Sequence, residues 1–218
     1  MNRTITVKGM GKVSAKPDYI ILSMTLKAQD MEYEKTMELA AEQLENLRNA
    51  IVGVGFKRDD LKTSNFNVQP DFQSERDNNG NYKRWFAGYV CSHALKVEFD
   101  FDMALLAQTF SALAKCLSEP EFSVQFTVKD KEAVSVSLLK NATENAKAKA
   151  IVLCEAACVT LGDLVTIDYN WGELHLYSPT QYEMADRCLA DAPCGSSIDI
   201  EPDDIDVSDT VTFIWEIA

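Results

Sequence analysis

Histidine and long apolar runs are what this sequence has least of. Only two histidines, His93 and His175, occur among its 218 residues, which leaves too few nitrogen ligands for a histidine-based zinc site. No apolar run approaches the roughly 20 residues that a transmembrane helix needs. The net charge of −13 disfavours nucleic acid and anionic membrane surfaces as main partners, because both require positive surface on the protein.

The sequence also lacks the recognised catalytic and nucleotide-binding motifs. Gly9-Met10-Gly11 lacks the third glycine and the following helix of a dinucleotide fingerprint, and no nucleophile elbow, Walker loop or His-Glu-x-x-His motif occurs. We therefore predict no catalytic, cofactor-binding or metal-binding residues. The alternative is an enzyme of an unrecognised class that uses His175 and nearby carboxylates. Six acidic residues precede or begin the last predicted strand: Asp199, Glu201, Asp203, Asp204, Asp206 and Asp209.

The six cysteines have no spacing typical of a disulfide framework. Cys154 and Cys158 lie four residues apart on one face of a predicted alanine-rich helix, so we expect both to be buried, reduced and free of metal. Cys188 and Cys194 flank a polar, acidic segment that is predicted to be a loop over 177–195. A thiol redox sensor that uses Cys188 and Cys194 therefore stays open as a second alternative function.

One long β-hairpin over 61–100 is the strongest structural signal. Asn79-Gly80 is a preferred type I′ turn, and placing it at the tip sets the register. Four pairs then face one another across the two strands: Phe72 with Ala87, Pro70 with Tyr89, Val68 with Cys91 and Phe66 with His93. Each strand of about 17 residues would span roughly 55 Å, which is longer than most strands in a domain of this size.

The length of this hairpin predicts a projecting arm at about 70–89. Aromatic side chains concentrate near its polar tip, and aromatic residues are enriched in interface cores. We therefore predict that the arm mediates contact between copies of the chain. The candidate interface residues are Phe72, Tyr82, Trp85, Phe86 and Tyr89.

Periodicity predicts an α+β fold with a mainly antiparallel sheet and three principal helices. The first helix is expected to start at Asp30 and to end at Gly53-Val54-Gly55, with an apolar stripe of Met37, Ala40, Leu44, Leu47 and Ile51. The second is expected to start at Asp100 or Asp102 with an apolar stripe through Leu117, and the third to run from Asp130 to about Val159. The expected strands are 4–14, 19–28, 122–128, 164–176 and 205–217. Strands 4–14 and 19–28 are predicted to be antiparallel neighbours, and a repeated order of helix, glycine turn and strand predicts two related α/β halves that share one sheet.

Four segments resemble the SIMPL-domain (DUF541) family. They are Ile5-Thr6-Val7-Lys8-Gly9-Met10-Gly11-Lys12-Val13 with Lys16-Pro17-Asp18, Leu61-Lys62-Thr63-Ser64-Asn65-Phe66 with Val68 and Pro70, Gly88-Tyr89-Val90 with Leu95-Lys96-Val97, and Ile200-Glu201-Pro202 with Ile205-Asp206-Val207-Ser208 and Val211. Their order and spacing extend over nearly the whole chain. The resemblance therefore covers one domain over 1–218, with the hairpin as its arm.

The resemblance implies the same α+β fold and self-assembly into a homo-oligomer. It supplies no catalytic residues and no cofactor. The family includes bacterial oxidative-stress defence proteins and a periplasmic immunogen, so a non-enzymatic role in oxidative or envelope stress is the expected function. The sequence enters a strand pattern directly from Met1 without a visible signal peptide. The expected location is therefore cytoplasmic as the sequence stands, and periplasmic or exported if a leader was removed.

Overall fold

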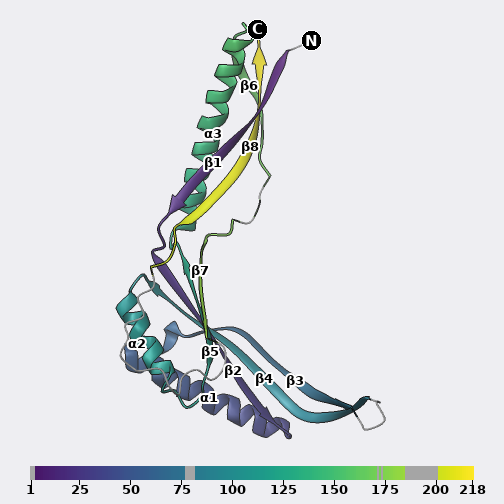
Figure 1. Cartoon of the computed structure of the whole chain (residues 1–218), viewed down its shortest axis with the longest axis vertical. Helices are drawn as coiled ribbons and strands as arrows, with labels where there is room; N and C mark the ends of the chain where they lie inside the picture. Colours follow the sequence, from purple (N-terminus) through teal and green to yellow (C-terminus); the bar gives the residue numbers. More distant parts are fainter. Residues whose placement is uncertain (1–2, 77–81, 171, 173, 185–200) are drawn as a thin grey trace. The chain divides into compact units, whose positions relative to one another are not determined.

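The computed structural model describes residues 3–76, 82–170, 172, 174–184 and 201–218, without the side chains of 75, 76, 82, 83 and 181–184. Figure 1 shows the elements. In chain order they are β1 (Thr4–Ala15), β2 (Tyr19–Asp30), α1 (Tyr33–Val54), the 3₁₀ helix η1 (Arg58–Asp60), β3 (Lys62–Arg76), β4 (Tyr82–Asp100), α2 (Met103–Leu113), β5 (Glu121–Thr127), α3 (Lys131–Ala156), β6 (Leu161–Asp168), β7 (Tyr177–Met184) and β8 (Ile205–Ile217). The predicted α+β class with three principal helices is confirmed.

The strands form two sheets, with orders β1-β8-β6 and β3-β4-β2-β5-β7. The chain divides into two compact units. One, called the α3 unit, comprises Met1–Asp18, Phe126–Thr180 and Pro202–Ala218; the other, called the α1 unit, comprises Tyr19–Gln125 and Gln181–Glu201. Each unit contains a strand, a helix and two further strands, with the last strand in the middle: β2-β4-β3 around α1, and β1-β8-β6 around α3. The predicted relation between two halves is visible in this order, but the prediction of one shared sheet is wrong.

The predicted pairing of the first two strands is also wrong. β1 pairs antiparallel with β8 over its whole length, and β2 pairs with β4. The segment between β1 and β2 is held by two hydrogen bonds of Asp18. Its N–H donates to the Thr127 carbonyl at 3.0 Å, and its carboxylate accepts from the Lys129 N–H at 2.7 Å. Alternation along a strand predicts which faces are buried, but it does not identify the partner strand.

The first helix begins later than expected. Glu32 is the N-cap of α1, whereas the carboxylate of Asp30 accepts from the Glu32 N–H at 2.9 Å just outside the helix. The glycine end is confirmed: Gly55 adopts a φ of 117° at the C-cap, a left-handed conformation that favours glycine. Leu47 and Ile51 on α1 are fully buried, as the predicted stripe requires.

The second helix begins as predicted and ends earlier. The Asp102 carboxylate caps α2 by accepting from the Leu105 N–H at 2.9 Å. α2 ends at Leu113, so Leu117 lies beyond the helix with 89% of its surface exposed. Its place in the predicted stripe is therefore wrong, because the helical period no longer applies after Leu113.

Small residues let α3 lie very close to β1. Asp130 caps the helix as predicted, accepting from the Ala133 N–H at 2.9 Å. A Cβ added at Gly9 would lie 2.0 Å from the Ala142 carbonyl oxygen, and one added at Gly11 would lie 2.0 Å from the Leu138 carbonyl oxygen. The buried stripe of α3 consists of Leu138, Ala142, Ala146, Ala150 and Cys154.

The end of α3 separates the two cysteines that were predicted to share a buried face. The helix ends at Ala156 rather than near Val159. Cys154 is buried as predicted, but Cys158 is exposed and has a φ of 56°, so its predicted burial is wrong. Spacing of four residues places two side chains on one face only while the helix continues.

The region after α3 differs from the expected single strand over 164–176. β6 ends at Asp168, and β7 occupies Tyr177–Met184, which was predicted to be loop. Ser178 is buried and donates its hydroxyl to the Asp203 carbonyl at 2.7 Å. The strand can bury this polar residue because the Ser178 hydroxyl has a hydrogen-bond partner. Cys188 and Cys194 lie outside the described residues. Among the described helices none is long and apolar enough to cross a membrane.

Candidate interaction site on the hairpin arm

The hairpin extends beyond the strand that supports it. Pairing between β2 and β4 stops at Asp30 and Tyr89, whereas β3 and β4 remain paired as far as Arg76 and Tyr82. Figure 1 shows this two-stranded extension continuing past the end of β2. We call the segment 70–89 the hairpin arm. Its predicted turn at Asn79-Gly80 lies outside the described residues.

Most of the predicted register is confirmed. Pro70 faces Tyr89, and the two pairs that precede the arm, Val68 with Cys91 and Phe66 with His93, are also as predicted. Phe72, however, faces Phe86 instead of Ala87, because a register shift between Asp71 and Phe72 leaves one extra residue on β4. A bulge of this kind accommodates an extra residue without a sequence pattern strong enough to predict it.

Gly88 fixes the base of the arm. Its φ is 117°, and an added Cβ would lie 2.4 Å from the Asp30 carbonyl oxygen, so both the conformation and the close approach favour glycine. The Gln29 amide donates to the Asp71 carboxylate at 3.3 Å and to the Ala87 carbonyl at 3.4 Å. The arm therefore leaves the sheet from an anchored position.

Aromatic rings line one face of the arm. The ring centroids of Phe72 and Phe86 are 5.7 Å apart, those of Phe86 and Tyr89 are 5.3 Å apart, and Tyr89 meets Tyr33 of α1 at 5.5 Å, all edge to face. The Arg84 guanidinium lies 4.3 Å from the Phe72 ring centroid. Such contacts stabilise a ribbon, because edge-to-face and cation–π geometry suits the charge distribution of the rings.

Among the described side chains of the arm, two aromatic ones remain open to solvent, on opposite faces. Phe72 is 44% exposed, and Trp85, which pairs with Gln73 and points to the other face, is 47% exposed. The structure thus brings Phe72, Phe86 and Tyr89 together and sets Trp85 apart from them. The backbone of Tyr82 lies in β4, but its side chain lies outside the described residues. Tyr33 is an addition that the sequence reasoning missed, and its aromatic ring at the start of α1 was the available signal.

The histidines occupy unlike positions. His93 is 6% exposed, its Nε2 lies 2.9 Å from the Thr63 hydroxyl, and its ring meets Phe66 edge to face at 5.0 Å. Burial, with a smaller effect of the Arg48 charge, lowers the pKa of His93, so the neutral imidazole is favoured. His175, the proposed base of the alternative enzyme, is exposed.

Two residues of the acidic segment before and within β8, Asp203 and Asp209, make hydrogen bonds to side chains elsewhere in the fold. The Tyr169 hydroxyl donates to the Asp209 carboxylate at 2.9 Å, and the Asp203 N–H donates to the Thr180 hydroxyl at 3.1 Å. Burial, followed by this contact with Asp209, raises the pKa of Tyr169. In the described ranges, no three His, Cys, Asp or Glu side chains come together in a way that could hold a metal ion.

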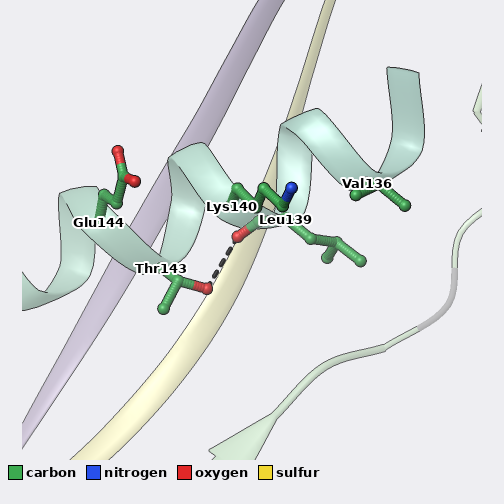
Figure 2. A pocket seen from close by; sticks show the side chains of 5 residues that line it. All are labelled: Val136, Leu139, Lys140, Thr143 and Glu144. Carbon is green, nitrogen blue, oxygen red and sulfur yellow. Dashed lines mark hydrogen bonds between the residues drawn. The ribbon is translucent and has the colours of Figure 1, made fainter. Parts of the chain in front are cut away.

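A shallow hollow lies along the outer flank of α3. Figure 2 shows the side chains that line it, which all come from this one helix. Val136 and Leu139 supply its apolar part, and the Thr143 hydroxyl donates to the Leu139 carbonyl at 2.8 Å. Lys140 and Glu144 complete the lining. The hollow presents no convergent set of catalytic groups, so the hairpin arm is the better candidate for function.

Comparison with known proteins assigns the chain to a family. The SIMPL family, a protein of unknown function (DUF541), matches residues 5–215, and the chain belongs to this family. It is similar to the 26 kDa periplasmic immunogenic proteins of Brucella melitensis biotype 1 and Brucella abortus, with 28% and 27% identity over 163 residues. Each match covers 75% of this chain and 65% of the relative, so the chain matches slightly less than two thirds of those proteins.

Proposed function

We propose that this SIMPL-family chain is a non-enzymatic protein that self-assembles through its hairpin arm. The proposal treats residues 1–218 as one SIMPL-like domain that comprises both units. One observation supports it above the others. The arm continues past β2 as a two-stranded ribbon, and a ribbon of that kind is marginal alone in water.

The exposed aromatic rings of the arm offer apolar surface that association could bury. A fully covered aromatic side chain buries about 150–250 Å², and Phe72 and Trp85 each expose a little under half of their surface. Covering both would contribute roughly 4 kcal/mol per copy at about 25 cal/mol per Å², before the entropy cost of association. That is a useful share of an interface but not a whole one, so further surface must take part.

Trimming the arm tests the proposal. Residues 73–84 are deleted and replaced by an Asn-Gly turn, which keeps the anchored base at Gly88. We expect the variant to retain the wild-type circular dichroism spectrum and to have a smaller mass by light scattering coupled to size-exclusion chromatography. An unchanged mass would contradict the proposal, as would a wild type that is monomeric at tens of micromolar.

A point-variant pair makes the test sharper. Phe72→Ser combined with Trp85→Ser removes the exposed rings without shortening the ribbon, and we expect it to lower the oligomer mass. Leu117→Ser is the matched control, since Leu117 is 89% exposed in the same unit but lies off the arm. Equal masses for the two variants would show that the exposed rings of the arm contribute no more to assembly than an exposed side chain elsewhere in the unit.

We further propose that the protein is exported and contributes to oxidative or envelope stress defence. The support is the name of its relatives, which are periplasmic immunogenic proteins. Cell fractionation of the native gene product should place it with periplasmic markers. A strain that lacks the gene should grow less well than its parent under peroxide or under detergent, and the arm-trimmed protein should fail to restore growth.

A further inference from the structure

Two edge strands, one in each unit, expose apolar side chains. On β6, Leu164, Val165 and Ile167 are 47%, 53% and 56% exposed, and on β3 Phe66 is 46% exposed. Both strands lie at the end of their sheet order. Within the described part of the chain, β6 pairs with β8 alone and β3 pairs with β4 alone. An apolar edge strand is a template for pairing with another chain.

In the sheet that contains β6, the strand at the opposite edge is β1, and α3 covers its outer backbone groups. On β1, the Met10 N–H donates to the Asn145 side chain at 3.0 Å. The Asn141 amide donates to the Lys12 carbonyl at 2.9 Å, and the Lys149 ammonium donates to the Lys8 carbonyl at 3.2 Å. α3 thus satisfies backbone groups of β1 that would otherwise face outward. β6 has no such cover from the residues that the structure describes.

We propose that β6 of one copy pairs antiparallel with β3 of a second copy, with Leu164 opposite Phe66 and Asp168 opposite Lys62. The inference rests on the proposed self-assembly and names a second contact surface for it, separate from the hairpin arm. It identifies the partner as another copy of this chain, because the two edges correspond at one bulge, in their helix-covered faces and in their charges.

One irregularity lies at a matching place in the two strands. β6 has register shifts between Leu161 and Leu164 and between Leu164 and Thr166, and β3 has one between Thr63 and Asn65, which lies opposite the second of these. In the proposed alignment Ile167 faces Thr63 and Leu164 faces Phe66, so both strands span three residues across the shift. A bulge discourages pairing with an ordinary edge, but it fits an edge that is bulged at the same point.

The helix-covered faces also agree. Leu164 and Ile167 pair with Trp215 and Phe213 of β8, which belong to the core beneath α3. Phe66 lies on the same face of β3 as Val68, which packs with Ala40 of α1. Opposed residues in antiparallel strands point to the same face. The proposed pairing therefore continues the helix-covered face of one sheet into the helix-covered face of the next.

Charge selects β3 over a second β6. β6 contains Asp163 and Asp168, and pairing two β6 strands with Leu164 opposite Ile167 would set these carboxylates against each other. Like charges directly opposite destabilise a strand pair. β3 instead offers Lys62 to Asp168 and Asn67 to Asp163. Because each copy has one β6 and one β3, the contact is heterologous and gives a ring or a linear chain.

Cross-linking of variants that each carry one added surface cysteine tests this pairing. Phe66→Cys and Leu164→Cys are made separately, with tags of different size, and are co-expressed or expressed alone before treatment with oxidised glutathione. The background removes the exposed thiol and the two outside the described residues through Cys158→Ser, Cys188→Ser and Cys194→Ser. We expect a disulfide-linked heterodimer in the co-expressed sample. Dimers from Leu164→Cys alone or from Phe66→Cys alone at equal yield would overturn the pairing, as would the absence of any cross-linked dimer.

Charge reversal gives an independent measurement. Lys62→Glu and Asp168→Lys should each lower the oligomer mass in light scattering, and the double variant should restore it. Masses that stay unchanged in both single variants would overturn the pairing. The cross-link is repeated in the arm-trimmed chain, which keeps β3 as far as Phe72. A cross-link that forms there, with an unchanged mass, refutes the arm but supports the strand pairing; a lost cross-link together with intact mass overturns the strand pairing.

Discussion

The two units share a strand order but pack their helices in different ways. In the α1 unit, large side chains such as Leu47 and Ile51 fill the space between helix and sheet. In the α3 unit the helix presents Ala142 and Ala146 to glycines of β1, and there is no room for another Cβ at Gly9. The same topology is thus compatible with a filled gap and with a closed gap. The α1 unit should therefore be sensitive to substitutions that remove side-chain volume, and the α3 unit to substitutions that add it.

The largest expected effect is a loss of volume in the α1 unit. Leu47→Ala should lower the free energy of unfolding by about 2–5 kcal/mol, because it leaves a cavity at a fully buried site. Leu47 is 0% exposed, whereas Leu44 in the same stripe is only half-buried. Leu44→Ala should therefore cost less. Urea midpoints of the two variants check this order, and equal midpoints would show that the cost does not follow the burial of the two side chains.

A gain of volume should damage the α3 unit. Gly9→Ala places a Cβ 2.0 Å from the Ala142 carbonyl oxygen and 2.7 Å from the Ala146 Cβ, and such overpacking costs about 1–3 kcal/mol. Gly53→Ala in α1 is the matched control, because an added Cβ there has nothing within 4 Å. The control should be neutral or slightly stabilising, since alanine favours helix. Thermal unfolding of both variants measures the contrast, and a neutral Gly9→Ala would refute the close approach of α3.

The α1 unit also differs from the α3 unit in carrying the hairpin arm. Alanine substitutions at two glycines test how closely the base of the arm contacts Asp30. Gly88 and Gly55 share a φ of 117°, but only Gly88 has a close neighbour for an added Cβ. Gly55→Ala should cost about 1 kcal/mol from its backbone conformation alone, and Gly88→Ala about 2 kcal/mol because the Asp30 carbonyl must also move. Chemical denaturation separates the two effects. Equal costs would show that the arm is not seated on Asp30.

Local chemistry made part of this fold predictable. The carboxylates of Asp102 and Asp130 were expected to cap helices and do so, and Gly55 was expected to end α1. These features depend on neighbours along the chain, so a single sequence contains them. The hairpin register from Phe66 to Pro70 was predictable for the same reason, because alternation and turn chemistry agreed.

Non-local partners were not predictable. The strand character of β1 was evident, but its pairing with β8 depends on residues about 200 positions away in sequence. β7 was taken for a loop because its buried hydroxyl, on Ser178, depends on a carbonyl of Asp203. At the candidate site, the bulge that moves Phe72 from Ala87 to Phe86 has no periodic signal. The hairpin partners of His93, Cys91 and Tyr89 could be predicted from the sequence, whereas the contact of Tyr89 with Tyr33 of α1 could not.

The smallest expected effect concerns the buried His93 of the α1 unit. Burial lowers the pKa of His93 in the folded chain, so the unfolded chain takes up the proton at a higher pH, near the usual value of about 6.5. The neutral imidazole therefore stabilises the fold fully above that pH, and this stability decreases as pH falls through the unfolded value towards the lower folded one. His93→Gln should flatten the fall in urea midpoint over this range. A wild-type slope in His93→Gln would show that protonation of His93 is not linked to folding.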